Sequence, residues 1–250
     1  MGVLASLWTR FAVGYCAFFS TLDYLLNGTR FPVYTYNRVS STLTIQCSAS
    51  PIHEKAVALI STRFILARNA LPENIQSKID IVTGEKFNNF FGRYRGSEKV
   101  PDLAIQVENN MGVCEPKFIL EVGLSEPYEK LRQDAELWLN GTETVEIVMV
   151  IKLHEEPPYH CPTQDLLDDE FNGLQFPSKE AINDQLFFVD DDYGPARYKN
   201  YVWVGRITGF VELWGRDEVS GLATPLGNPS QIVSYFQDTR VLVAEAAEAN

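Results

Sequence analysis

The sequence predicts an α/β fold whose elements follow the order helix, three strands, helix, strand. Three observations support this order. Apolar residues recur at helical spacing from Ala56 to Ile65, and the same spacing returns from Leu124 to Trp138. Residues 145–153 (VEIVMVIKL) then form a nearly continuous apolar run. Such a run is typical of a strand buried at the centre of a sheet.

Three short segments between the two helices are rich in isoleucine, valine or leucine, which is typical of strands. We expect them to form a meander at residues 78–83, 101–107 and 117–122. The first helix is expected to follow Pro51 and to end before Pro72, because proline fits the first turn of a helix but not its interior.

The later part of the chain adds a predicted β-hairpin to this order. The second helix is expected to stop at Asn140-Gly141, a pair that favours turns. Residues 201–207 and 210–214 have strand composition and are separated by Thr208-Gly209, so we expect a C-terminal hairpin that turns there.

With 250 residues, of which 45% are apolar, the chain is long enough to bury one substantial core. We therefore expect a single domain over residues 1–250, with its core at 48–153. The segments around this core are expected to be an N-terminal extension (1–47), an acidic peripheral excursion (154–192), a hairpin region (193–239) and a tail (240–250).

The net charge of −12 opposes a nucleic-acid partner, because phosphate binding requires basic surface. The charge is unevenly distributed, however. Residues 154–192 contain eleven acidic residues and a single lysine, a net charge of −10, so the remainder of the chain is much closer to neutral. Nucleic acid therefore stays a candidate partner, and nothing in the sequence points to a particular protein partner.

The four cysteines lie far apart without a CxxC pair, which fits reduced thiols and an intracellular location in the cytoplasm or nucleus. Stable membrane insertion is not expected, because the apolar run 1–19 is interrupted by Arg10 and is too short to span a bilayer. Gly2 followed by Ser6 matches an N-myristoylation pattern, but this pattern is common by chance and one acyl chain anchors only marginally.

Two carboxylates are predicted to meet on one face of the sheet. The loop between the second and third strands has its midpoint near Met111-Gly112, so an antiparallel pairing places Asp102 almost opposite Glu121. Carboxylate oxygens are the ligands that Mg²⁺ and Mn²⁺ prefer. The alternatives are a buried Glu121 paired with a lysine or arginine, and an Asp102 that serves only the turn after Pro101.

Pro101-Asp102, followed after a hairpin by Glu121-Val122-Gly123 and then by a helix, resembles the PD-(D/E)XK nuclease superfamily. The resemblance covers roughly residues 51–153. Within it, residues 118–139 are similar to a group of uncharacterised fungal proteins with this core. The resemblance implies a restriction-endonuclease-like fold and metal-dependent hydrolysis of phosphodiester bonds in nucleic acid, with Asp102 and Glu121 as catalytic metal ligands.

The chain departs from this superfamily at Gly123, where the superfamily usually has a lysine on the same strand face as the glutamate. Either catalysis is lost, leaving an inactive module that binds protein or nucleic acid, or an amine comes from elsewhere. Lys130, four residues before Asp134 in the second helix, is the candidate for that amine, and Gln133 is a weaker one. The alternative for Lys130 and Asp134 is an exposed helix pair.

The superfamily often supplies a further acidic metal ligand from its leading helix, and Glu54 is the residue at that position. The alternative is a first-turn glutamate that complements the helix dipole. Just before Asp102, the basic residues Arg93, Arg95 and Lys99 alternate with aromatic ones, which suits contact with a nucleic-acid backbone. The alternative is a hairpin with one apolar face and one solvated basic face.

Overall fold

The computed structural model describes residues 33–46, 51–160, 188–189, 195–198 and 201–227, together with Leu167, Glu170 and Gly173. The chain divides into two compact units, of which the larger comprises residues 16–152 and 211–231 and the smaller comprises residues 1–15, 153–210 and 232–250. The predicted tail, the Gly2 pattern, and most of the predicted N-terminal extension and acidic excursion lie outside the described residues.

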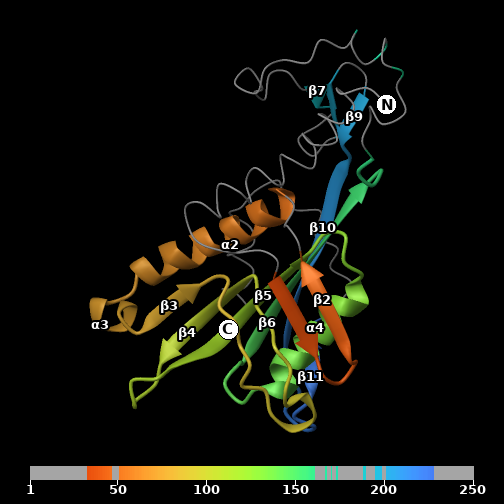
Figure 1. The fold of residues 1–250 in the computed structure, drawn as a ribbon. Coiled ribbons are helices and arrows are strands. Elements are labelled where there is room, and N and C mark those ends of the chain that lie inside the picture. The colour runs from red at the N-terminus through yellow and green to blue at the C-terminus, as the bar shows by residue number, and fades with distance from the viewer. Residues whose placement is uncertain are drawn as a thin grey trace. The chain divides into compact units, whose positions relative to one another are not determined.

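A mixed six-stranded sheet has the strand order β11-β10-β6-β5-β4-β3 (Figure 1). β3, β4 and β5 form the predicted antiparallel meander, and β6 then runs parallel to β5. The α/β class and the four predicted core strands are therefore confirmed. The strand bounds are Ile79–Val82 (β3), Leu103–Glu108 (β4), Cys114–Gly123 (β5), Ile147–Glu156 (β6), Arg206–Arg216 (β10) and Ala223–Leu226 (β11).

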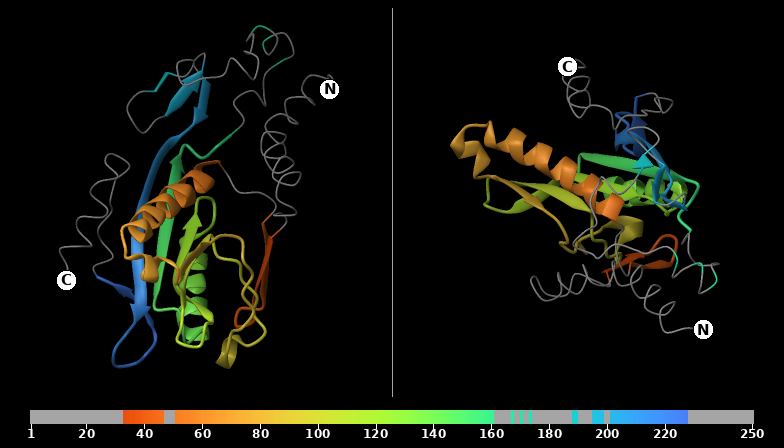
Figure 2. Two further views of the ribbon diagram at one scale, coloured as in Figure 1. Left: turned by 90° about the vertical axis from the view of Figure 1, so that its left-hand side faces the viewer. Right: turned by 90° about the horizontal axis from the view of Figure 1, so that it is seen from above.

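Two main helices pack on opposite faces of this sheet, and Figure 2 shows them from two further directions. On β5, Phe118 contacts Phe64 of α2 (Pro51–Asn69), with their ring centroids 4.8 Å apart. The next residue, Ile119, belongs instead to the core beneath α4 (Tyr128–Gly141). This alternation follows from the strand geometry, in which successive side chains point to opposite faces.

The second helix begins four residues later than the sequence pattern predicts. Pro127 occupies its N-cap, and the helix starts at Tyr128. Proline disfavours helical geometry in the residue that precedes it, so Glu126 cannot lie within a helix that continues through Pro127. Residues 124–127 therefore form a loop directly after β5, next to the predicted site. A one-turn helix, α3 (Glu73–Gln76), follows α2 in the same way after Pro72.

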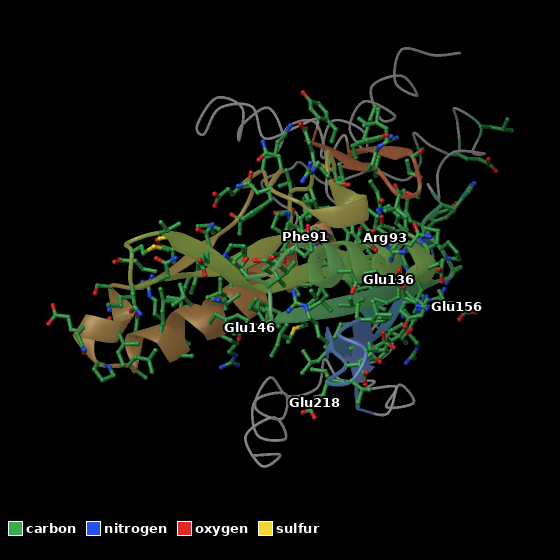
Figure 3. The ribbon with its side chains drawn as sticks, turned by 90° about the horizontal axis from the view of Figure 1, so that it is seen from below. Phe91, Arg93, Glu136, Glu146, Glu156 and Glu218 are labelled. Carbon is green, nitrogen blue, oxygen red and sulfur yellow. The ribbon has the colours of Figure 1, made fainter. Side chains whose placement is uncertain are left out.

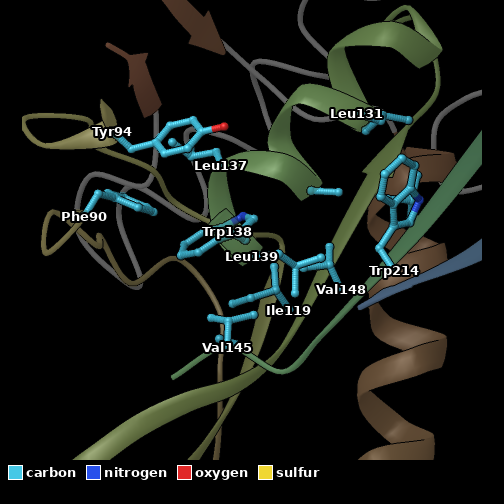
Figure 4. Close-up of a cluster of buried hydrophobic side chains, with 13 residues drawn as sticks. Phe90, Tyr94, Ile119, Leu131, Leu137, Trp138, Leu139, Val145, Val148 and Trp214 are labelled. Carbon is cyan, nitrogen blue, oxygen red and sulfur yellow. The ribbon is translucent and has the colours of Figure 1, made fainter. Parts of the chain in front are cut away.

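Trp138 of α4 lies at the centre of the buried core (Figure 4). Its ring is fully buried and contacts those of Phe87 and Phe90 at centroid distances of 5.4 and 5.3 Å. Valines and isoleucines of β5 and β6 complete this core beneath the helix. Aromatic side chains bury a large apolar area, so this tryptophan is a major contributor to the stability of the larger unit.

A short hairpin of β1 (Val33–Asn37) and β2 (Thr42–Gln46) lies beside the segment that precedes β4. The backbone of Tyr36 exchanges two hydrogen bonds with that of Glu98, at 2.7 and 2.9 Å. On the next residue, Lys99 exchanges two more with Phe87, at 2.8 and 2.9 Å. The backbone hydrogen bonds with Tyr36 and Phe87 thus fix residues 98 and 99 and hold Lys99 in one orientation.

The carboxyl end of α4 is held by residues from far along the chain. Arg216, at the end of β10, donates hydrogen bonds from Nε to the carbonyl of Leu139 (2.9 Å) and from Nη2 to that of Thr142 (2.6 Å). The backbone N–H of Ala223 donates to Oδ1 of Asn140 at 2.9 Å. The last carbonyls of a helix lack partners within the helix, and here Arg216 of β10 and the backbone of Phe91, which donates to the carbonyl of Gly141 at 2.9 Å, supply some of them.

The predicted turn at Thr208-Gly209 is wrong. Both residues lie within β10, which is continuous and rich in strand-forming residues, so their turn preference is overridden. The hairpin partner of β10 is β11, and the turn between them lies at Asp217–Gly221, where Oδ1 of Asp217 accepts hydrogen bonds from the backbone of Val219 and Ser220. Gly221 has a φ of +67°, a conformation that favours glycine.

The smaller unit contains a three-stranded antiparallel sheet of β7 (Phe188–Val189), β8 (Ala196–Tyr198) and β9 (Tyr201–Val204). Residues 201–204, which were expected to pair with residues 210–214, therefore pair with β8. Across the described ranges, no helix combines the length and the apolarity needed to cross a bilayer.

Candidate functional site

Asp102 and Glu121 lie at the same end of the β4–β5 pair. The register pairs Leu103 with Leu120, which places the two carboxylates opposite each other, as the loop midpoint predicts. Oδ2 of Asp102 accepts a hydrogen bond from the backbone N–H of Val122 at 2.7 Å. This bond fixes the aspartate against the strand that carries Glu121.

Both carboxylate oxygens of Glu121 face donors from the protein. Oε1 accepts a hydrogen bond from Nε1 of Trp138 at 2.7 Å, and Oε2 lies 3.1 Å from Nζ of Lys99. Glu121 is only 5% exposed, so the carboxylate depends on these donors rather than on water. The alternative of a buried Glu121 paired with a lysine therefore describes the observed geometry.

Asp134 of α4 shares the same ammonium group. Its Oδ2 lies 2.7 Å from Nζ of Lys99, its Oδ1 lies 2.6 Å from Nζ of Lys130, and the residue is 1% exposed. Lys99 therefore bridges one carboxylate from β5 and one from α4. We refer to Lys99, Glu121 and Asp134 as the lysine-bridged cluster.

A second group of charges adjoins this cluster at the start of α2. Nε2 of His53 lies 3.2 Å from Oδ1 of Asp102, and Nδ1 of His53 lies 3.5 Å from Oε1 of Glu54. Glu54 is partly exposed, with 47% of its side chain accessible. His53 of α2 therefore lies between Glu54 and Asp102 and contacts both carboxylates.

The pKa values reflect this crowding. Burial on its own lowers the pKa of His53, but the close contacts of the ring with the Asp102 and Glu54 carboxylates outweigh it, and the pKa rises to about 10. Burial raises the pKa of Glu121 to about 8, against the opposing effect of Lys99, and the neighbouring Asp134 and Asp102 carboxylates add to the increase. The pKa of Lys99 is raised, because Asp134 and Glu121 outweigh the effect of burial.

The loop between β5 and α4 adds one further acidic group. The pKa of Glu126 is raised, chiefly because the side chain is buried, and the Asp134 carboxylate contributes to the increase. The raised pKa values of Glu121 and Glu126 share burial as their main cause, and the nearby Asp134 and Asp102 carboxylates add to both. An additional positive charge would offset the contribution of these carboxylates.

The structure corrects the prediction that Lys99 belongs to a basic nucleic-acid-binding surface. Lys99 is only 6% exposed, and its ammonium group points into the lysine-bridged cluster. Arg93 and Arg95 are exposed, as that prediction requires, and Phe91 is 41% exposed. Figure 3 labels Phe91 and Arg93 among the side chains. Two of the three predicted basic contacts therefore remain available to a partner.

Lys130 and Asp134 are not the exposed helix pair that was one alternative. They lie one turn apart on the face of α4 that also carries Trp138, and Lys130 is only 16% exposed. Gln133 precedes Asp134 by one residue, so its side chain is rotated by about 100° from this face, and it is half-buried. Of these two candidate residues, Lys130 is the one in direct contact with the cluster.

The space beside Glu121 at Gly123 is filled by a side chain of α4. A Cβ atom at Gly123 would lie 2.8 Å from Cδ1 of Leu131, which is fully buried. A side chain at position 123 would therefore force this core leucine to move. Glycine at position 123 therefore allows Leu131 of α4 to pack closely against β5.

The carboxylates of the cluster do not form a ready divalent-metal site. All four oxygens of Glu121 and Asp134 lie within 3.1 Å of nitrogen donors from the protein. Within the part of the chain that the structure describes, no three His, Cys, Asp or Glu side chains are grouped so that they could hold a metal ion. A metal ion bound between these two carboxylates would have to displace the Lys99 ammonium.

Together these features define an α/β protein with a mixed six-stranded sheet and a buried ion-pair cluster between that sheet and α4. Comparisons of the chain with protein-family models, curated proteins and solved structures found no match. Sequence reasoning assigned no site role to Trp138 and the wrong one to Lys99. The only available signal was the position of Lys99 three residues before Asp102.

Proposed function

We propose that the chain is a catalytically inactive nuclease-like module that binds nucleic acid. The order α2, β3, β4, β5, α4, β6 and the pairing of these strands support a restriction-endonuclease-like core. Asp102 and Glu121 lie opposite each other at the end of β4 and β5, which is where the resemblance to the PD-(D/E)XK superfamily assigns the metal-binding carboxylates.

The single observation that favours an inactive module is the position of the Lys99 ammonium. It lies between Glu121 and Asp134, with its backbone fixed on both sides. Hydrolysis of a phosphodiester by Mg²⁺ requires carboxylate oxygens that are free to bind the ion. In this cluster the oxygens of Glu121 and Asp134 already have nitrogen donors as partners, so a metal ion would have to compete with them.

We expect the unmodified protein to leave single- and double-stranded DNA and RNA intact in millimolar Mg²⁺ or Mn²⁺. The measurement is a gel-based cleavage assay, with Glu121→Gln as the reference in which one cluster carboxylate has lost its charge. Metal-dependent cleavage by the unmodified protein, lost in Glu121→Gln, would contradict the proposal.

A metal-dependent nuclease is the second candidate, and the carboxylate excess favours it. Glu121 has a pKa of about 8 because burial and the neighbouring Asp134 and Asp102 oppose its ionisation, and a divalent ion would relieve this repulsion. Under this candidate, Asp102 and Glu121 bind Mg²⁺ or Mn²⁺, assisted by Glu54. The catalytic amine is then Lys99 or Lys130, both of which contact Asp134.

Exposed basic side chains support binding to a nucleic-acid backbone. Arg93 and Arg95 flank the buried Tyr94, and the guanidinium of Arg93 donates a hydrogen bond to the Tyr94 hydroxyl at 2.8 Å. Arginine contacts with phosphate release counterions and therefore make affinity depend on salt. The exposed ring of Phe91 next to them offers a surface for base stacking.

Replacing both Arg93 and Arg95 with alanine is expected to weaken duplex binding and to reduce the slope of log affinity against log salt by about 1.8, the loss of two phosphate contacts. Fluorescence anisotropy over a salt series measures this slope. Lys55→Ala, which removes an exposed charge from α2, is the control and should leave the slope unchanged. An unchanged slope in the double variant would place the binding surface elsewhere, and no binding by the unmodified protein would favour a protein partner.

A further inference from the structure

We infer that Lys99 is an internal cation that excludes divalent metal ions, and that Glu121 and Asp134 bind Mn²⁺ or Mg²⁺ only when this ammonium is removed. The inference deepens the proposed function and rests on it, because it concerns the same carboxylates. Three features support it: the position of the Lys99 ammonium, the backbone hydrogen bonds that hold Lys99 in place, and the two buried carboxylates that its removal would leave.

The Lys99 ammonium occupies the position that a shared cation would take. Its Nζ lies 3.1 Å from Oε2 of Glu121 and 2.7 Å from Oδ2 of Asp134, so one positive centre joins two carboxylates from different elements. Carboxylate oxygens converging on one point are also the donors that Mg²⁺ and Mn²⁺ require. The two cations therefore compete for the same oxygens.

The competition favours lysine because the ammonium is tethered. The backbone of Lys99 exchanges two hydrogen bonds with Phe87, and the preceding Glu98 exchanges two with Tyr36. The side chain of Glu98 points outwards to an exposed ion pair with Lys86, so the alternation of the segment aims Lys99 inwards. A metal ion would have to displace an amine whose effective concentration at the site is high.

Lys130 provides a natural comparison. It contacts the other oxygen of Asp134, at 2.6 Å, and lies closer to the solvent than Lys99 does. Removal of Lys130 leaves the Lys99 ammonium between Glu121 and Asp134. Removal of Lys99 leaves two buried carboxylates facing each other without the cation that joined them. Both lysines contact Asp134, but only Lys99 also contacts Glu121. Comparing the two variants therefore distinguishes the loss of one positive charge from the loss of the bridge between the carboxylates.

The test uses Mn²⁺ as the probe and compares Lys99→Met with Lys130→Met. We expect 10 mM Mn²⁺ to raise the thermal midpoint of Lys99→Met by about 4 °C or more and to leave the unmodified protein and Lys130→Met within about 1 °C. Electron paramagnetic resonance of free Mn²⁺ measures binding directly, and only Lys99→Met should deplete it. Adding Glu121→Gln to Lys99→Met should abolish both effects.

Lys99→Gln keeps a polar side chain at the position and serves as the second variant if Lys99→Met folds poorly. The inference is overturned if both variants fail to respond to Mn²⁺, that is, if neither refolds, shifts its thermal midpoint or depletes the free ion. An equal response in the unmodified protein overturns it as well. Failure of the proposed function has a different signature, which is metal-dependent cleavage of nucleic acid by the unmodified protein.

Discussion

Replacing Asp134 with alanine is expected to lower the free energy of unfolding by about 3–5 kcal/mol, the range measured when one partner of a buried ion pair is removed. Asp134 is 1% exposed and contacts the ammonium groups of both Lys99 and Lys130. Its loss leaves Lys99 buried with the Glu121 carboxylate as its remaining partner in the cluster. Urea unfolding followed by circular dichroism measures the difference.

Two control variants separate the charge from the packing. Lys130→Met removes the less buried of the two lysines and leaves Lys99 in place, so it should cost less than Asp134→Ala, about 1–3 kcal/mol. The triple variant Lys99→Met, Glu121→Gln, Asp134→Leu removes all three charges of the lysine-bridged cluster and should recover much of the loss in Asp134→Ala, because buried ion pairs can often be exchanged for uncharged packing. A triple variant as unstable as Asp134→Ala would show that the buried charges are not the source of the destabilisation.

The stability of the larger unit is expected to fall between about pH 6.5 and pH 10, because His53 is protonated in the folded state. The pKa of His53 is about 10 when folded and about 6.5 in its ordinary state, so its contribution is fully present below pH 6.5 and is lost as the pH rises through 10. We expect a difference of roughly 2–4 kcal/mol between the two ends of this window, which is less than the full shift implies because Glu54 is half exposed.

The comparison for this prediction is His53→Gln, which cannot titrate. Glu121 changes stability in the same direction over an overlapping range, since its raised pKa of about 8 also favours the protonated form in the folded state. The relevant quantity is therefore the difference between the unmodified protein and His53→Gln at each pH, measured by urea unfolding. Parallel curves for the two proteins would mean that His53 is not charged in the folded state.

Local patterns predicted the parts of the fold that depend on neighbouring residues. The helical spacing in α2 and α4 reflects one buried face, and the apolar run in β6 reflects burial on both faces. The opposition of Asp102 and Glu121 was also predictable, because a hairpin with its tip near Gly112 has only one register that buries its apolar face.

The role of Lys99 could not be predicted in this way, because it depends on contacts that are distant in the sequence. Its partner Asp134 lies 35 residues further along the chain, and its backbone is held by Phe87 on one side. A basic residue in a basic and aromatic segment gives the same local signal whether it faces solvent or a buried carboxylate. The filling of the space at Gly123 by Leu131 is likewise a property of helix packing.

The hydrogen bonds from Arg216 to the carboxyl end of α4 have a consequence for the newly made protein. The guanidinium reaches the carbonyl of Thr142 across 74 residues of chain, so the carbonyls of Leu139 and Thr142 lack this donor until that arginine leaves the ribosome. At about 5–20 residues per second, this takes roughly 4–15 s after residue 142 is synthesised. During this interval the carbonyls of Leu139 and Thr142 have only water in place of the guanidinium, and the core around Trp138 lacks the strand that carries Trp214. A chain that stops before Arg216 would remain in this incomplete state.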